Sequence, residues 1–305
     1  MKLQKKSLLA SLAAAAVLVG MSSNASAGLD ITNWQLNLNS LSGSPTNYSN
    51  VAGLVDSGIS NLAFNGESYV TNAATSQPGI YNSTDVGVFN VLQYNNGNAL
   101  KLGGGQLTAY FQGTDITNVN TGSYTFQTGT FSVYYNPTAV YGTTSANNYG
   151  ATAGTMIASF KVDPTQNPNT SGGFINPDGT PTSNGTVTLT GQAPTTLNPS
   201  NIFLDSNGNS FNQNILLSFV TSNASLDTSA NPNTPSSSSQ YTIDQNLVTG
   251  LGVTAGTYNG QYGLNYFIQN GGQVKLQYAP EPMTVALFGA GLLAMGWSLR
   301  RRSNV

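Results

Sequence analysis

Asparagine-glycine dipeptides punctuate the chain and set the spacing at which its backbone can reverse direction. They begin at Asn65, Asn96, Asn184, Asn207, Asn259 and Asn270. A type I′ turn needs φ > 0 at both central residues, and asparagine followed by glycine adopts that conformation readily. Each dipeptide also lies near apolar or β-branched segments. The repeated dipeptide therefore predicts a chain built from β-hairpins.

Segments near these turns alternate between apolar and polar residues, as half-buried strands do. The segment "ITNWQLNLNS" places Trp34, Leu36 and Leu38 on one face. In the same way "FSVYYNP" places Phe131, Val133 and Tyr135 together, and "GTVTLTGQ" places Val187 and Leu189 together. Further strands are predicted over residues 86–94, 106–112, 155–162, 215–221, 262–269 and 273–278. About ten to twelve short strands, with no long stripe of helical period, predict an all-β domain, either an antiparallel β-sandwich or a jelly-roll-like domain.

Residues 28–278 are interpreted as one domain of this kind. Two polar stretches, 163–185 and 221–240, are rich in Pro, Ser, Thr and Asn and are predicted to be long loops within it. Strands resume soon after each stretch, which favours insertions over a domain boundary. The alternative is two domains joined through the 163–185 segment.

The N-terminus has the three parts of a secretory signal peptide. Lys2, Lys5 and Lys6 form a basic region, "SLLASLAAAAVLVG" forms an apolar region, and Ala25-Ser26-Ala27 has the small-residue pattern of a cleavage site. Residues 1–27 are therefore predicted to form a signal helix that is removed by cleavage, with Ala25 and Ala27 as the small residues of the cleavage site. The alternative is a retained N-terminal membrane helix.

The C-terminal segment 279–305 also has three parts in a fixed order. A Pro-Glu-Pro tripeptide is followed by the uncharged run 283–299 and then by an arginine triplet, the named residues being Pro280, Glu281, Pro282, Arg300, Arg301 and Arg302. As a helix, 17 residues just span a hydrocarbon core of roughly 30 Å. Glycine, serine and threonine dilute its hydrophobicity, which indicates a weak or temporary anchor with the arginines on the cytoplasmic side.

This tail is similar to the PEP-CTERM sorting signal of exported bacterial proteins. The resemblance covers about 27 of 305 residues and rests on the tripeptide, the apolar helix and the arginine cluster in that order. It implies sorting by an exosortase, a membrane enzyme that recognises and cleaves the tail, in bacteria that make exopolysaccharide. The chain would then be anchored only transiently in the inner membrane through residues 283–299. The alternative is a permanent single-span anchor.

A second resemblance lies in the body of the chain. The segments "NLAFNGESYV", "ALKLGGGQLTAYFQGT", "TFQTGTFSVYYNP" and "VTLTGQ" look like phrases of the flocculation-associated PEP-CTERM proteins. This resemblance implies a role beside exopolysaccharide in cell aggregation, that is, in floc or biofilm formation. It brings no catalytic residues with it.

Charge and missing residue types exclude several classes of function. Between the two terminal signals, three lysines face ten carboxylates, which leaves a net charge of about −7 and no arginine. Nucleic-acid binding relies on clustered Lys and Arg, so no nucleic-acid partner is expected. The chain has no His and no Cys, which excludes His- and Cys-based catalysis, haem ligation and the usual zinc sites. We therefore expect no catalytic residue, no cofactor and no metal site.

Carboxylate chemistry is the enzymatic route that remains. A glycan hydrolase needs two carboxyls about 5 to 9 Å apart, and no close pair of acids occurs in the sequence. The segment "DSNGNSF" places Asp205, Asn207 and Asn209 at alternate positions, as in a calcium loop. The bidentate Glu of that motif is replaced by Leu216. The preferred interpretation is an Asn-Gly turn between two strands.

These observations predict an exported, non-enzymatic structural or adhesive protein of the cell surface or extracellular matrix. The alternative is an extracellular carbohydrate-binding, lectin-like module, because the chain is rich in Tyr and Asn. Its mature tryptophan, Trp34, lies in an alternating strand where burial is the expected outcome. A carboxylate-based glycan hydrolase is the third possibility.

Overall fold

The computed structural model describes residues 29–41, 54–95, 97–162, 172–174, 185–192, 201–211, 215–226, 244–254 and 265–278. The first of the chain's two units, Asp30–Gln277, contains nearly all of the described residues. The predicted signal peptide 1–27 and sorting signal 279–305 lie outside the described residues. Within the described residues, no helix has the length and apolarity needed to cross a membrane.

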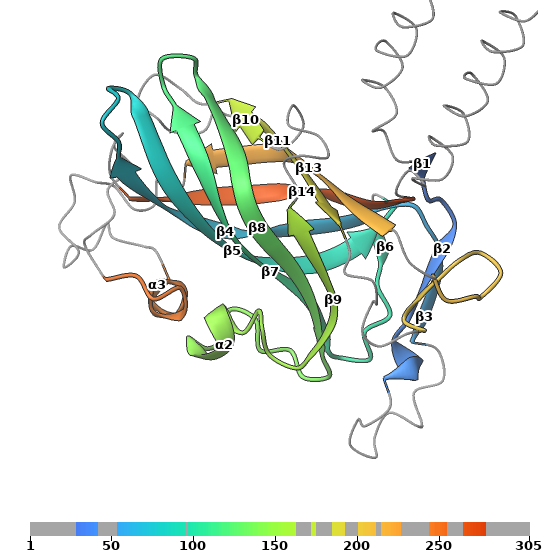
Figure 1. The fold of residues 1–305 in the computed structure, drawn as a ribbon. Coiled ribbons are helices and arrows are strands. Elements are labelled where there is room, and N and C mark those ends of the chain that lie inside the picture. The colour runs from blue at the N-terminus through green and yellow to red at the C-terminus, as the bar shows by residue number, and fades with distance from the viewer. Residues whose placement is uncertain are drawn as a thin grey trace, which may run out of the picture. The chain divides into compact units, whose positions relative to one another are not determined.

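Long antiparallel strands make up most of the first unit (Figure 1). The strands are β1 (Leu29–Asp30), β2 (Trp34–Asn37), β3 (Val55–Ile59), β4 (Leu62–Ala74), β5 (Ile80–Tyr94), β6 (Asn98–Ala99), β7 (Gln106–Asn118), β8 (Ser123–Asn136), β9 (Thr155–Val162), β10 (Gly172–Phe174), β11 (Gly185–Gln192), β12 (Phe203–Leu204), β13 (Ile215–Leu226) and β14 (Tyr266–Tyr278). The helical elements are a 3₁₀ turn at Leu38–Ser40, α2 (Ala146–Tyr149) and α3 (Gln245–Gly250). The predicted all-β, antiparallel class is confirmed.

One 11-stranded sheet curls around the core, and its ends meet. Nine of its strands follow the order β1-β14-β13-β11-β10-β8-β7-β5-β4, and β14 also pairs with β4. The other two lie off this path: β6 pairs with β5, and β9 pairs with β8 and β11. That last pairing runs without a break from Tyr266 opposite Val70 to Val274 opposite Leu62. The curled sheet therefore encloses its apolar face between opposite walls, as a sandwich does. The edges of β4 and β14 that meet at this junction are hydrogen-bonded to each other.

Consecutive strands are neighbours over much of the sheet. β4 pairs with β5, β5 with β7, β7 with β8 and β8 with β9, all antiparallel. This is a meander, and the jelly-roll connections that the sequence analysis allowed are not seen among these strands. β10 lies inside the segment 163–185 that was predicted to be a loop, and β13 extends into the predicted loop 221–240 as far as Leu226.

Two of the predicted Asn-Gly turns are wrong. Asn65-Gly66 lies within β4 and Asn270-Gly271 lies within β14, so the strands predicted over 262–269 and 273–278 belong to one strand. The two dipeptides face each other, because Gly66 pairs with Asn270 and Asn65 with Gly271. At Asn207-Gly208 the chain does turn, but only Gly208 has positive φ, +83°, so the turn is not the predicted type I′. The dipeptides that begin at 96, 184 and 259 lie wholly or partly outside the described residues.

Packing explains why glycine occupies the middle of these strands. A methyl group at Gly66 would lie 2.7 Å from Cα of Phe89, and one at Gly113 would lie 2.5 Å from Cζ of Phe111. The rings of Phe89 and Phe111 therefore lie against backbone that carries no side chain. Glycine allows close packing at these positions. The sequence alone does not distinguish a glycine needed for close packing from one needed for a turn.

A second sheet of three strands, in the order β12-β2-β3, packs on the same core. Trp34, Leu36 and Leu38 are all buried, as their alternation predicts, and so is Phe203 of β12. The rings of Trp34 and Phe203 lie 5.8 Å apart between centroids. The small sheet thus contributes aromatic side chains to the interior of the curled sheet.

Two side chains of β7 attach the segment around α2 to the outside of the sheet. Gln106 Oε1 accepts hydrogen bonds from the backbone N–H groups of Val140 and Tyr141, at 2.6 and 2.7 Å, and its Nε2 donates to Gly150 O. Thr108 Oγ1 donates to Ala151 O at 2.7 Å. Both side chains are buried and their hydrogen bonds are made, so this attachment is structural.

Candidate functional site

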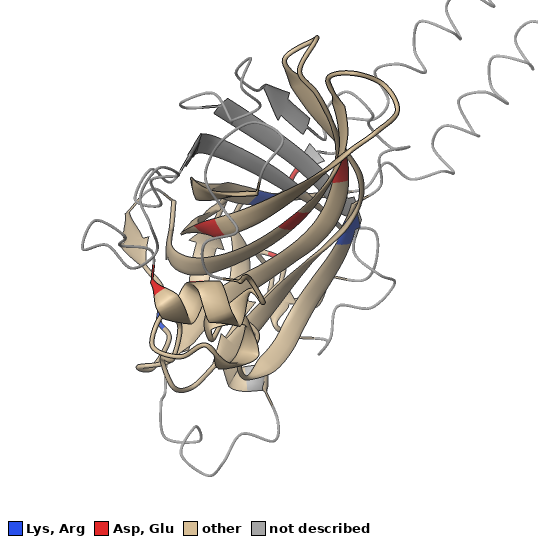
Figure 2. Cartoon of the chain, turned by 90° about the vertical axis from the view of Figure 1, so that its left-hand side faces the viewer, with Lys and Arg blue, Asp and Glu red and all other residues tan. Residues whose placement is uncertain are grey.

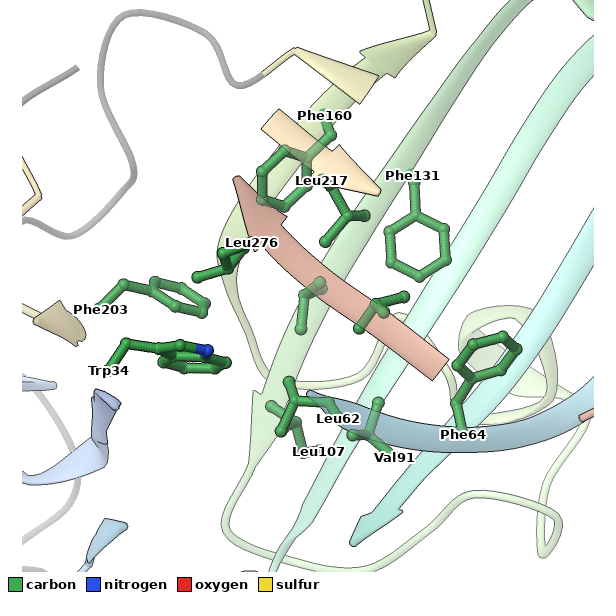
Figure 3. Close-up of a pocket in the computed structure, with 12 residues that line it drawn as sticks. Trp34, Leu62, Phe64, Val91, Leu107, Phe131, Phe160, Phe203, Leu217 and Leu276 are labelled. Atoms are coloured by element: carbon green, nitrogen blue, oxygen red, sulfur yellow. The ribbon is translucent and has the colours of Figure 1, made fainter. Parts of the chain in front are cut away.

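The interior of the curled sheet is apolar where the small sheet packs against it. Twelve side chains surround a small cavity of about 20 Å³ (Figure 3). A buried water molecule needs roughly 10–15 Å³, so the cavity has room for about one. Trp34 Nε1 borders the cavity and has no hydrogen-bond partner. A space of this size cannot hold a sugar ring.

Further along the same interior the side chains become polar. On β5, Ser83 and Asp85 follow the inward positions of Phe89 and Gly87, and on β7, Asp115 and Thr117 continue the inward series that begins with Phe111. Asp85 pairs with Gly113, and Asp115 pairs with Ser83. The two aspartates are therefore diagonal neighbours on adjacent strands, a relationship that separates backbones by about 7–8 Å and side chains by somewhat less.

Hydroxyl groups connect Asp115 to Asn72 of β4. Thr117 Oγ1 lies 2.9 Å from Asp115 Oδ1, Ser83 Oγ lies 3.0 Å from Thr117 Oγ1, and Ser83 Oγ lies 2.7 Å from Asn72 Oδ1. Each hydroxyl carries one proton, so two hydroxyl protons serve three contacts. The third contact needs a proton from the carboxyl of Asp115 or from the amide of Asn72.

Burial raises the pKa of both aspartates. Desolvation, with a smaller contribution from the nearby charge of Asp115, raises the pKa of Asp85 to about 8, although a hydrogen bond from Ser68 opposes the rise. Desolvation raises the pKa of Asp115 to about 6, although hydrogen bonds from Thr117 and Ser83 oppose the rise. Burial also raises the pKa of Tyr124 well above its usual value, with Asp115 and Asp85 adding to the effect. The tyrosine therefore stays protonated beside the two carboxyls.

No cationic side chain among the described residues neutralises the two aspartates. Lys275 forms an ion pair with Asp30 at 3.2 Å, and Lys101 Nζ donates to Val55 O. Lys161 is exposed on β9, where it pairs with Thr130. Charged residues are few throughout the described part of the chain (Figure 2). Asp85 Oδ1 itself is buried and has no hydrogen-bond partner.

The outer surface of the same strands carries a row of threonines. Thr71 pairs with Thr84, Thr84 with Thr114, and Thr114 with Thr128, and all four are exposed. Neighbouring strands lie about 4.7–4.9 Å apart, so the row is evenly spaced. The Oγ1 atoms of Thr114 and Thr128 are 2.8 Å apart. We call this row the threonine face; the exposed residues beside it, Asn82, Gln112 and Ile116, are also uncharged.

The segment tested as a calcium loop is a hairpin turn. Asp205 Oδ1 accepts hydrogen bonds from the backbone N–H groups of Asn207 and Asn209, both at 2.8 Å. Leu204 pairs with Ser210 across the turn. Hydrogen bonds from Asn209 hold the pKa of Asp205 below its usual value. The carboxylate oxygens thus already have donors, and the preferred interpretation as a turn is confirmed.

The residues predicted from the terminal signals cannot be placed. The cleavage residues Ala25 and Ala27, the tripeptide 280–282 and the arginines 300–302 lie outside the described residues. Trp34 is 1% exposed, so burial, the expected outcome, is confirmed. A sugar cannot stack on its ring in this conformation.

The proximity of Asp85 and Asp115 is not apparent from the sequence, in which the acids are scattered singly. The two residues are 30 positions apart, and the register of β5 on β7 brings them together. One signal was present: each aspartate is four residues from an inward phenylalanine, Phe89 or Phe111, and so shares its face in an alternating strand.

Comparisons with known proteins give no relative from which a function could be transferred. The chain matches no protein-family model, no curated protein and no solved structure.

Proposed function

We propose that the chain is an exported, non-enzymatic structural or adhesive protein of the cell envelope or extracellular matrix. It would be sorted by an exosortase and act with exopolysaccharide in cell aggregation. The observation that carries this proposal is the ordered tail, in which Pro280-Glu281-Pro282, an uncharged run and Arg300–Arg302 follow one another in a chain that begins with a signal-peptide pattern. The N-terminal signal helix and a sorting helix over 283–299 belong to the proposal.

The folded part supports a non-catalytic role in two ways. The interior cavity is too small for a sugar, and the aspartate pair lies among buried side chains. The exposed threonine face carries hydroxyl, amide and methyl groups without charge. Such a surface suits contact with a neutral, hydroxyl-rich polymer, because neither partner must give up a charged group's hydration.

The sorting proposal is tested in the producing bacterium by replacing Pro280, Glu281 and Pro282 with alanine. We expect the protein to keep its tail and to remain in the inner membrane, as measured by intact mass with mapping of the terminal peptides. The matched control replaces Ser303, Asn304 and Val305 with alanine, which preserves the tail's three parts. Normal cleavage of the tripeptide variant would contradict the proposal.

The adhesive role has its own test. Removal of the whole gene should weaken cell aggregation, measured as the settled fraction of a culture, and the intact gene should restore it. Removal of 280–305 alone should misplace the protein and weaken aggregation as well. Unchanged aggregation in the strain that lacks the gene would overturn the adhesive role while leaving the sorting proposal intact.

The threonine face favours direct carbohydrate binding as a second candidate function. The protein should bind the producer's own exopolysaccharide in a calorimetric titration, and Thr114→Lys should weaken that binding at least several-fold. Thr32→Lys is the matched control, because Thr32 is exposed but lies outside the face. A flat titration with the unaltered protein would count against this function.

A further inference from the structure

Two carboxyls that face the interior without a protein counter-charge, one on the buried Asp115 and one on the partly buried Asp85, need another source of positive charge. Asp115 is 6% exposed, and Asp85 Oδ1 is buried with no hydrogen-bond partner. Buried carboxylates in proteins are neutralised by a proton, by a cationic side chain or by a metal ion. The lysines of the described chain lie elsewhere, as shown above. This leaves the proton and the metal ion.

The groups around the pair are oxygen donors. The hydroxyls of Ser83 and Thr117 are 2% and 3% exposed, and both lie in the contact chain that ends at Asp115 Oδ1. Within the described residues no three acidic, His or Cys side chains gather, so hydroxyls and water would complete the ligand set. An all-oxygen set selects a hard cation, and irregular geometry favours Ca²⁺ over Mg²⁺, which requires a near-ideal octahedron.

We propose that Asp85 and Asp115 bind a Ca²⁺ ion in the polar part of the interior, with Ser83 and Thr117 as neutral oxygen donors. The unpartnered Oδ1 of Asp85 is the atom that carries this inference. Binding would replace protons on the two carboxyls by a cation and tie β5 to β7 at the point where the interior changes from apolar to polar. The site is independent of the sorting proposal.

Thermal unfolding of the full chain in detergent tests the site. The unfolding midpoint is measured in EDTA and in up to 10 mM CaCl₂, at pH 8.5 and constant ionic strength, where protons compete least. We expect a saturable rise in midpoint with half of the effect on the order of 0.1–1 mM, the range of extracellular calcium modules. An unchanged midpoint would overturn the proposal and leave protons as the source of neutralisation.

Isosteric variants separate binding from folding. Asp85→Asn and Asp115→Asn should lose the response to Ca²⁺, yet each should unfold in EDTA no earlier than the unaltered protein because one uncompensated carboxyl is gone. Asp205→Asn is the control, since its carboxylate lies in the exposed turn, and it should keep the full response. A full response in Asp85→Asn would overturn the proposal.

Terbium luminescence provides a direct measure of occupancy. Tb³⁺ replaces Ca²⁺ at oxygen sites and emits when a nearby tyrosine is excited, and Tyr124 lies close enough to both aspartates for their charges to affect its pKa. We expect tyrosine-sensitised emission that Ca²⁺ displaces and that Tyr124→Phe reduces several-fold. Emission of equal strength in Asp85→Asn would place the ion elsewhere and overturn the assignment.

Discussion

Gly66 of β4 lies directly opposite Asn270 of β14, at the junction that closes the curled sheet. A side chain at Gly66 would collide with Val88 O and with Phe89, whereas one at Gly271, its neighbour across the same junction, would meet no atom within 4 Å. We expect Gly66→Ala to lower the free energy of unfolding by about 1–3 kcal/mol or more, because backbone must move. Urea unfolding measures this.

Gly271→Ala is the matched control for that prediction. It lies in the same ladder and has room for a methyl group, so it should be neutral or stabilise by about 0.4–1 kcal/mol through the unfolded chain. Equal losses in both variants would show that glycine is needed at the junction for another reason than close packing.

Gln106 should be among the polar side chains most important for stability. Gln106→Met keeps a similar length but leaves the N–H groups of Val140 and Tyr141 without their acceptor. It also removes one of the two hydrogen bonds to Gly150 O, which keeps the bond from Ala153 N. At about 1–3 kcal/mol for an unsatisfied buried group, we expect a loss of roughly 2–5 kcal/mol in urea unfolding. Gln112→Met, exposed on the same strand, should change stability by less than about 0.5 kcal/mol.

Stability should fall as pH rises from 5 to 9 in calcium-free buffer. The pKa values of Asp115 and Asp85 are raised to about 6 and about 8 in the folded state, so the folded chain binds more protons than the unfolded chain in this interval. The stability that these two carboxyls contribute is fully present below about pH 4. It is lost as the pH rises, first through the pKa of Asp115 at about 6 and then through that of Asp85 at about 8. The chain has no histidine to confuse the measurement.

Urea unfolding at pH 5, 7 and 9 in EDTA measures this dependence, for which we expect a total on the order of a few kcal/mol. Asp85→Asn should remove the step near pH 8, and Asp205→Asn should leave the profile unchanged because the pKa of that exposed acid is lowered. Stability that rises between pH 5 and 9 would show that the two carboxyls are not the dominant titrating groups.

Asp244 should stabilise the attachment of α3 to α2. Its carboxylate accepts a hydrogen bond from Asn246 N at 2.7 Å and another from Tyr149 Oη at 2.9 Å. Asp244→Ala loses both and should cost about 0.5–2 kcal/mol locally, while Asp244→Asn retains an N-cap oxygen and should cost less. Hydrogen exchange of the α3 amides measures the effect. Equal protection of the α3 amides in Asp244→Ala and Asp244→Asn would rule out loss of the N-cap hydrogen bond as the cause of the destabilisation.

Local patterns predicted the strands well where one face of the strand is apolar. The segment 155–162 is β9 without change, and the inward sets of Trp34 and Phe131 are buried as their alternation requires. The same approach failed at Asn65-Gly66, because a dipeptide that favours a turn also fits a strand where an aromatic ring lies against bare backbone. It failed at Asn270-Gly271 because that dipeptide pairs with Asn65-Gly66 inside a continuous ladder. The whole strand β4 was missed for this reason.

The sequence by itself determined the all-β class, the residue types available for chemistry and the hypothesis of two terminal signals. These follow from local alternation, from the absence of His and Cys, and from short ordered motifs. Tertiary structure alone decided that β14 closes the sheet against β4 and that Asp85 meets Asp115, since both depend on strand register between distant segments. Register is set by packing and pairing across the whole sheet, and a single residue of slip would turn each aspartate to the opposite face.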